Sequence, residues 1–198
     1  MVGVGSSSLL APTRQKARFC AGLFIARDSA IMTTLLPVDS DSRLIRLCDL
    51  AELIWNEYFP SIIGQAQVDY MLARFQSREA IEAQIAAGYR YFLIQPAGAP
   101  LGYAAFRDDF DDASRFLSKL YIRGDMRGRG IASQVLGEIL GEAREAGLET
   151  LWLTVNRHNR LAIDVYQTLG LRITGELVTD IGAGFVMDDY RMEMDIDD

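Results

Sequence analysis

The sequence predicts a mixed α/β fold in which helices flank a central, mainly antiparallel sheet of about seven strands. Two observations support this prediction. Short runs rich in β-branched and aromatic residues recur along the chain between turn-forming residues, as strands require. Segments with apolar residues at helical spacing separate some of these runs, and one such segment joins two strands that we therefore expect to be parallel.

Length and composition are typical of a single domain. The chain has 198 residues, of which 49% are hydrophobic, so it can bury a substantial core. Its net charge of −7 argues against a general nucleic-acid binder, and no hydrophobic run is long enough to cross a membrane. Cys20 and Cys48 cannot form a disulfide framework, and no Cys/His cluster has metal-ligand spacing. We expect residues 31–198 to form one domain in the reducing cytoplasm, without a metal.

Residues 1–30 differ from the rest of the chain. The segment contains three consecutive serines and several basic residues, with no acidic residue before Asp28. This composition is typical of a disordered extension or of a transit-like peptide. Met32 immediately precedes the first expected strand, so an upstream start codon is a third explanation. We favour a dispensable extension.

The domain is expected to begin with one strand and three helical segments. The strand runs from Thr33 to Leu36. The first helix begins at Ser40 or Asp41, either of which can cap it, and ends at Pro60. The second contains Val68, Met71, Leu72 and Phe75 at helical spacing, and the third begins at Ser77 and ends before Gly88.

An antiparallel meander of three strands follows. Its strands are predicted at Tyr89–Gln95, Leu101–Arg107 and Arg115–Ile122, with the acidic run of residues 108–112 in the second turn. A helix from Ile131 to Ala146 then leads to a strand at Thr150–Val155, parallel to the third strand of the meander. This β-helix-β unit should be right-handed.

A helix and two strands complete the chain. Asn159 can cap a helix whose apolar face contains Leu161, Ala162, Val165, Tyr166 and Leu169, and Gly170 ends it. The closing strands are predicted at Leu171–Val178 and Phe185–Met194, joined by a glycine-rich turn.

The turn before Ile131 has the composition of a phosphate-binding site. The sequence Arg127-Gly128-Arg129-Gly130 lies between a strand and a helix N-terminus. Free N–H groups and the positive end of the helix dipole favour an anion there, and glycines let a phosphate come close. The two arginines offer charge-assisted hydrogen bonds. A solvated basic loop is the simpler explanation of the same residues.

Two segments in register resemble the GNAT superfamily of N-acetyltransferases. The first, RGRGIA at residues 127–132, resembles the R/Q-x-x-G-x-G/A pyrophosphate loop that holds acetyl-coenzyme A, with Ala132 in place of the commoner glycine. The second, NRLAIDVYQTLGL at residues 159–171, resembles the N-x-x-A-x-x-x-Y-x-x-x-G-F element, with Leu171 where Phe is usual. The resemblance covers residues 33–194 and implies a GNAT-like fold, with the sheet splayed at its fourth and fifth strands.

The resemblance also implies roles for individual residues. The backbone at Leu120, Tyr121 and Ile122 would contact the pantetheine arm of acetyl-coenzyme A. The pyrophosphate would be held by Arg127, Gly128, Arg129, Gly130, Ile131, Ala132 and Ser133. Asn159 would contact the coenzyme near its thioester, although a plain helix cap explains this residue equally well. Tyr166 would protonate the leaving thiolate, because a phenol with a pKa near ~10 is matched to an alkyl thiol. Trp55, Tyr58, Tyr70 and Met71 are candidates for the acceptor wall, or else for the core.

Several residues are candidates for the general base that would accept the proton of the amine. The candidates are Glu52, Glu57, Asp108, Asp109 and Glu176, and family members also use a water chain. His158, the only histidine, has a suitable unperturbed pKa, but we expect a loop histidine beside Arg157 to face solvent. Cys48 has no histidine partner in the sequence pattern, so a covalent acyl-enzyme is unsupported.

The function predicted from the resemblance is transfer of an acetyl group from acetyl-coenzyme A to a primary amine, by direct attack in a ternary complex. The amine belongs to a small molecule or a protein. A non-catalytic binder or sensor of acyl-coenzyme A is the alternative, and a nucleotide-binding protein is disfavoured because no Lys-Ser/Thr follows the glycines. A homodimer is left open, and neither nucleic acid nor a membrane is an expected partner.

Overall fold

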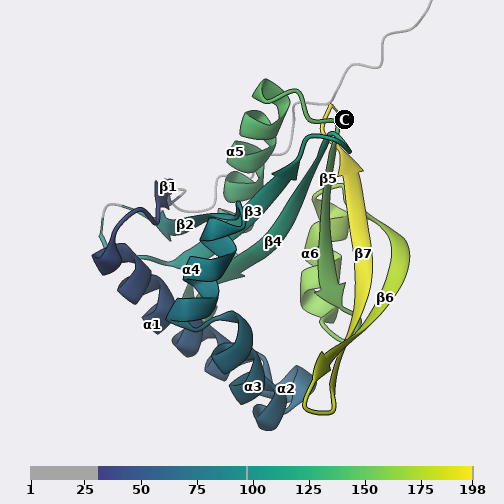
Figure 1. Cartoon of the computed structure of the whole chain (residues 1–198). Coiled ribbons are helices and arrows are strands. Elements are labelled where there is room, and N and C mark those ends of the chain that lie inside the picture. Colours follow the sequence, from purple (N-terminus) through teal and green to yellow (C-terminus); the bar gives the residue numbers. More distant parts are fainter. Residues whose placement is uncertain (1–30, 97, 198) are drawn as a thin grey trace, which may run out of the picture.

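The structure is a computed structural model that describes residues 31–96 and 98–197. The proposed dispensable extension at residues 1–30, with its two alternatives, lies outside the described residues. A seven-stranded sheet runs through the domain in the order β1-β2-β3-β4-β5-β7-β6 (Figure 1). The strands are β1 (Thr34–Pro37), β2 (Arg90–Gln95), β3 (Gly102–Asp109), β4 (Ser114–Ile122), β5 (Thr150–Asn156), β6 (Arg172–Gly182) and β7 (Phe185–Asp195).

Neighbouring strands pair antiparallel except β4 and β5, which pair parallel. The predicted mixed, mainly antiparallel sheet is therefore confirmed. The helices are α1 (Asp41–Tyr58), α2 (Pro60–Ile63), α3 (Gln65–Phe75), α4 (Arg78–Ala86), α5 (Ile131–Glu145) and α6 (Arg160–Thr168), with one 3-10 turn at Gly124–Met126.

The short helix α2 was not predicted from the sequence. Pro60 was expected only to end a helix, and α1 does end just before it, at Tyr58. Pro60 also occupies the first turn of α2, where its fixed φ suits a helix and its missing N–H costs no hydrogen bond. The same residue therefore separates two helices.

The sheet has a separate hydrophobic core on each face. One core packs α5 and α6 against side chains such as Phe106, Leu151 and Met192, all fully buried. The other packs α1, α3 and α4 against side chains such as Leu93 and Tyr103. Because strand side chains alternate between faces, β2, β3 and β4 each contribute side chains to both cores.

The sheet opens between β4 and β5. These strands pair only at Ser114–Phe116 with Thr150–Trp152. Just beyond this pairing, the register between β3 and β4 shifts by one residue. Phe106 lies opposite Leu117, whereas its neighbour Ala105 lies opposite Lys119, so Ser118 of β4 has no partner residue on β3. A bulge of this kind bends its strand. Figure 1 shows β4 and β5 side by side at one end and diverging toward the other, so the predicted splay is present.

The β6–β7 hairpin extends beyond the sheet to reach α3 (Figure 1). The Tyr70 hydroxyl donates a hydrogen bond to the carbonyl oxygen of Ile181, and Gln67 Nε2 donates to the carbonyl oxygen of Val186 at 2.9 Å. These contacts close one end of the opening between β4 and β5. Among the described residues, no helix has the length and hydrophobicity needed to cross a membrane.

Candidate active site

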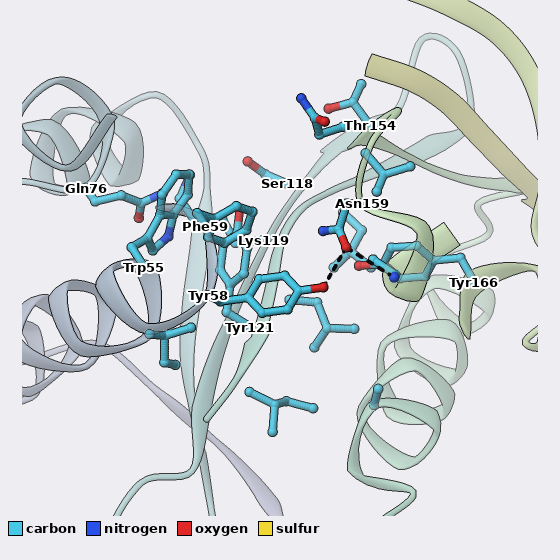
Figure 2. Close-up of a pocket in the computed structure, with 18 of the residues that line it drawn as sticks. Trp55, Tyr58, Phe59, Gln76, Ser118, Lys119, Tyr121, Thr154, Asn159 and Tyr166 are labelled. Carbon is cyan, nitrogen blue, oxygen red and sulfur yellow. Dashed lines mark hydrogen bonds between the residues drawn. The ribbon is translucent and has the colours of Figure 1, made fainter. Parts of the chain in front are cut away.

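The opening between β4 and β5 holds a pocket of about 990 Å³. Residues 126–128, 130–133 and α6 line one part of it, which we call the cradle arm. Residues of α1, α3, α4 and β4 line the other part, which we call the helical arm. Because the strands diverge, the two arms join through the sheet. Figure 2 shows Trp55, Phe59 and Lys119 on one side of the pocket and Asn159 and Tyr166 on the other.

The cradle arm ends at the N-terminus of α5. The first helix turn presents the N–H groups of Ile131, Ala132 and Ser133, and none of them donates to a carbonyl group within the described chain. Gly128 and Gly130 have φ values of 73° and 77°, in the left-handed region that glycine adopts without a Cβ clash. This arrangement combines unpaired donors with the positive end of a 15-residue helix, which suits an anion.

The two arginines of the turn differ in position. Arg127 lines the pocket, its Nε donates to the carbonyl oxygen of Ile122 at 2.9 Å, and its guanidinium lies 4.3 Å from the centre of the Tyr58 ring. Glu57 lies 3.7 Å from Arg127 Nη1 and accepts a hydrogen bond from Gly124 N at 3.3 Å. Arg129 is exposed and does not line the pocket. The other eleven site residues predicted from the sequence all line it.

Asn159 joins the two arms. Its Oδ1 caps α6 by accepting from Ala162 N at 3.3 Å, and it also accepts from the Tyr58 hydroxyl at 2.7 Å. Figure 2 shows both hydrogen bonds, with the Asn159 side chain between Tyr58 and Tyr166. The residue is therefore a helix cap and a pocket residue at once. The hydrogen bond from Tyr58 also ties α1 to α6 across the opening.

The Tyr166 side chain lies on the pocket-facing side of α6. Burial raises its pKa to about 12, and the neighbouring Tyr58 phenol adds to the rise. The hydroxyl therefore keeps its proton at neutral pH and can donate a hydrogen bond.

Asp189 on β7, which was not predicted as a site residue, is a buried carboxylate in the pocket wall. It is 7% exposed. Burial raises its pKa to about 6, while a hydrogen bond from Thr154 acts in the opposite direction and Asp188 raises it further. Such a carboxylate is ionised at neutral pH yet holds a proton more strongly than usual. These properties are typical of a general base.

None of the predicted base candidates lines the pocket. Glu52, Asp109 and Glu176 are exposed, and Glu176 forms an ion pair with Arg157 at 3.0 Å. Glu57 contacts Gly124 and Arg127 instead. His158 is exposed, as expected for a loop histidine.

Asp108 forms an ion pair with the buried Arg115. Its two carboxylate oxygens accept hydrogen bonds from Arg115 at 2.6 and 2.8 Å. Arg115 is fully buried, donates to the carbonyl oxygen of Ile139 at 2.8 Å, and lies 4.1 Å from the centre of the Phe106 ring. Asp108 therefore neutralises a buried cation.

The helical arm has apolar and aromatic walls. They are formed by Trp55, Phe59, Met71, Phe75 and Phe116. Three of the four proposed wall residues, Trp55, Tyr58 and Met71, line the pocket, whereas Tyr70 faces the β6–β7 hairpin instead. The arm also contains Lys119, a buried cation that was predicted only as a strand residue.

Two observations on the described residues concern metal ions and cysteine. No group of three or more His, Cys, Asp and Glu side chains in residues 31–96 and 98–197 is arranged to hold a metal ion. Cys48 lies outside the pocket wall, and burial together with Asp49 raises the pKa of its thiol. A raised pKa disfavours the thiolate that a nucleophilic cysteine needs.

The family model described as "Acetyltransferase (GNAT) family" matches residues 48–171. Among curated relatives, the chain is 27% identical over 99 residues to the L-amino acid N-acyltransferase MnaT of Escherichia coli K12, a match covering 48% of this chain and 58% of that protein. It is 29% identical over 100 residues to an L-methionine sulfoximine/L-methionine sulfone acetyltransferase of Pseudomonas paraeruginosa, with the same coverage of 48% and 58%. The matches thus span little more than half the length of these relatives.

The fold is also similar to that of a solved structure, the PaiA N-acetyltransferase of Thermoplasma acidophilum in complex with coenzyme A. The TM-score is 0.68, and the match covers 83% of this chain and 99% of that one, with 16% sequence identity. At this identity the similarity shows a common fold and no more.

Proposed function

Because the chain belongs to the GNAT acetyltransferase family, we propose that it transfers the acetyl group of acetyl-coenzyme A to a primary amine. The observation that carries this proposal is the junction of two unlike arms in one pocket. One arm ends in unpaired N–H groups suited to a diphosphate, and the other has apolar walls suited to an organic acceptor. Tyr166 and Asp189 line the same pocket.

The cradle arm fits the coenzyme. The N–H groups of Ile131, Ala132 and Ser133 would hold the diphosphate, with Gly128 and Gly130 leaving room for it. The pantetheine arm would lie along Leu120–Ile122, where β4 no longer pairs with β5. Acetyl-coenzyme A would supply an acetyl group already activated as a thioester.

The roles of base and hydrogen-bond donor are assigned from the raised pKa values of Asp189 and Tyr166. Asp189, ionised at neutral pH, would accept the proton that the amine loses on attack. Tyr166 would donate its O–H hydrogen bond to the sulfur as negative charge develops there. Complete proton transfer from a phenol of pKa about 12 to a thiolate whose acid has a pKa near 8.5 is uphill by about 5 kcal/mol. We therefore assign the rate effect of Tyr166 to the hydrogen bond.

The curated relatives guide the choice of acceptors. Their names specify L-amino acids and L-methionine sulfoximine or sulfone. We propose a small primary amine as acceptor for this chain, attacked directly in a ternary complex without an acyl-enzyme. The reducing cytoplasm remains the proposed location.

Binding of coenzyme A to a matched pair of glycine variants tests the cradle. Gly130 and Gly147 lie just before and just after α5, with φ values of 77° and 76°, and a Cβ on either would meet no atom within 4 Å. Gly130→Ala and Gly147→Ala should therefore cost similar stability, about 1 kcal/mol each. Only Gly130→Ala should weaken coenzyme A binding, by tenfold or more, in isothermal titration calorimetry. Equal affinities for both variants would contradict the proposed cradle.

Release of free thiol from acetyl-coenzyme A in the presence of a panel of primary amines tests the reaction itself. Thiol release that depends on the amine supports transfer. Tight coenzyme A binding with no amine-dependent release would instead favour the alternative, a non-catalytic binder of acyl-coenzyme A.

A further inference from the structure

Lys119 is a buried cation in the wall of the helical arm. It is the only lysine in the described part of the chain and is 7% exposed. Its Nζ donates a hydrogen bond to Gln84 Oε1 at 3.2 Å and lies 5.7 Å from the centre of the Tyr91 ring. The side chain lines the pocket, on the sheet face that packs against α1, α3 and α4.

Gln84 is held in a fixed orientation around this ammonium group. Its Nε2 donates to the carbonyl oxygens of Phe75 and Ala80 at 3.0 and 3.1 Å, and its Oε1 also accepts from the Tyr91 hydroxyl at 2.7 Å. The ammonium group has three N–H donors. Gln84 accepts one of them, and no other hydrogen-bond acceptor within the described chain contacts Nζ. Two donors of a buried cation are therefore left for another molecule.

The charge of Lys119 is also uncompensated within the described residues. None of their ion pairs involves Lys119 or Arg74, a second cation that lines the helical arm from α3. Burial lowers the pKa of Lys119 to about 8, so its ammonium group is still mostly protonated at neutral pH. Buried charges are normally paired, because desolvation of a lone charge is costly.

We propose that Lys119 binds the carboxylate of an amino-acid acceptor. This inference rests on the proposed acetyl transfer and names the acceptor class. Two free N–H donors on one ammonium group match the two oxygens of a carboxylate. The apolar walls of the helical arm accommodate the acceptor's side chain. Asp189, which lines the same pocket from β7, attracts the amino group. One pocket thus offers a cation for the carboxylate and an anion for the amine.

Matched acid and amide acceptors test the inference. Thiol release is measured with acetyl-coenzyme A and L-methionine, L-methioninamide, L-phenylalanine or L-phenylalaninamide, which differ within each pair only in the carboxylate. The wild-type chain should prefer each acid over its amide by about 10- to 100-fold in kcat/KM, as expected for a charge-assisted hydrogen bond. Lys119→Met, which keeps an unbranched apolar side chain, should lose this preference through a higher KM for the acids.

Arg46→Met is the control for loss of one positive charge, because Arg46 is exposed on α1 and does not line the pocket. This variant should keep the wild-type preference. A wild-type enzyme that uses the amides as well as the acids would overturn the inference, whether or not any variant folds. A Lys119→Met enzyme that retains the preference for acids would overturn it too.

Failure of the transfer reaction gives a different result, namely no thiol release with any acid or amide. Calorimetry of L-methionine binding in the presence of coenzyme A then decides the role of Lys119. Binding weakened about tenfold or more in Lys119→Met supports the carboxylate site. Equal binding by both proteins, or no binding, refutes it.

Discussion

The substitution Asp189→Asn should abolish most activity and at the same time stabilise the fold. The carboxylate is buried in the pocket wall, and its pKa is raised from 3.8 to about 6. Because the folded protein holds this proton more tightly than the unfolded chain, the stability from protonation is fully present below about pH 4. That stability is lost as the pH rises through about 6.

The magnitudes follow from the raised pKa. The rise from 3.8 to about 6 corresponds to a folding cost of up to about 3 kcal/mol at pH 7. An asparagine carries no charge and avoids this cost, so Asp189→Asn should raise the free energy of unfolding at pH 7 by up to about 3 kcal/mol, and the gain should vanish below about pH 4. Loss of a general base should lower kcat/KM by about 10²- to 10⁴-fold.

The assay combines thiol release with urea unfolding over a range of pH. In the wild-type enzyme about nine-tenths of a group with a pKa near 6 is ionised at pH 7 and about one-tenth at pH 5, so kcat/KM should fall about tenfold between these values. Asp188→Asn is the matched control, because Asp188 is the next residue and forms an ion pair with Arg157 at 2.7 Å. We expect little loss of activity and no stabilisation in the control.

An Asp189→Asn enzyme that keeps a third or more of the wild-type kcat/KM would refute the assignment of Asp189 as the base. A wild-type profile that stays flat between pH 7 and pH 5 would refute it as well. A variant that is inactive but less stable would show instead that Asp189 is needed for folding.

Three further predictions concern other parts of the chain. Tyr166→Phe should lower kcat about 10- to 1000-fold while leaving the affinity for coenzyme A within twofold in calorimetry, and near-normal turnover would disprove its role at the sulfur. Asp108→Asn should lower the free energy of unfolding by about 3 kcal/mol in urea titration, because it leaves the buried Arg115 with only the longer contact to Glu142, at 3.5 Å, and an unchanged midpoint would contradict this. Deletion of residues 1–30 should leave both folding and turnover intact, and an insoluble product would count against a dispensable extension.

The elements with strong local signals were predicted closely from the sequence. The strand before the cradle was expected at Arg115–Ile122 and spans Ser114–Ile122, and the following helix begins at Ile131 as expected. Both are fixed by residues close in sequence, namely an apolar strand, a pair of glycines and a helical apolar stripe. The cap at Asn159 was identifiable for the same reason.

The acid–base chemistry of the pocket was not predictable in the same way. Asp188 and Asp189 are adjacent in β7, and nothing in their residue type tells them apart. Strand alternation places Asp189 on the same face as Met187, and both line the pocket, whereas Asp188 is half-buried. Lys119 was visible as a strand residue, but its face depends on the bulge at Ser118, which reverses the alternation along β4. No local sequence pattern indicates the bulge at Ser118. Asp189 and Lys119 line one pocket because β4 and β5 separate.

A crystal structure of the chain with coenzyme A tests the central claim most directly. We expect the diphosphate against the N–H groups of Ile131, Ala132 and Ser133, and the sulfur in the opening between β4 and β5, within reach of the Tyr166 hydroxyl. Coenzyme bound at another surface, or a sulfur far from both Tyr166 and Asp189, would contradict the account.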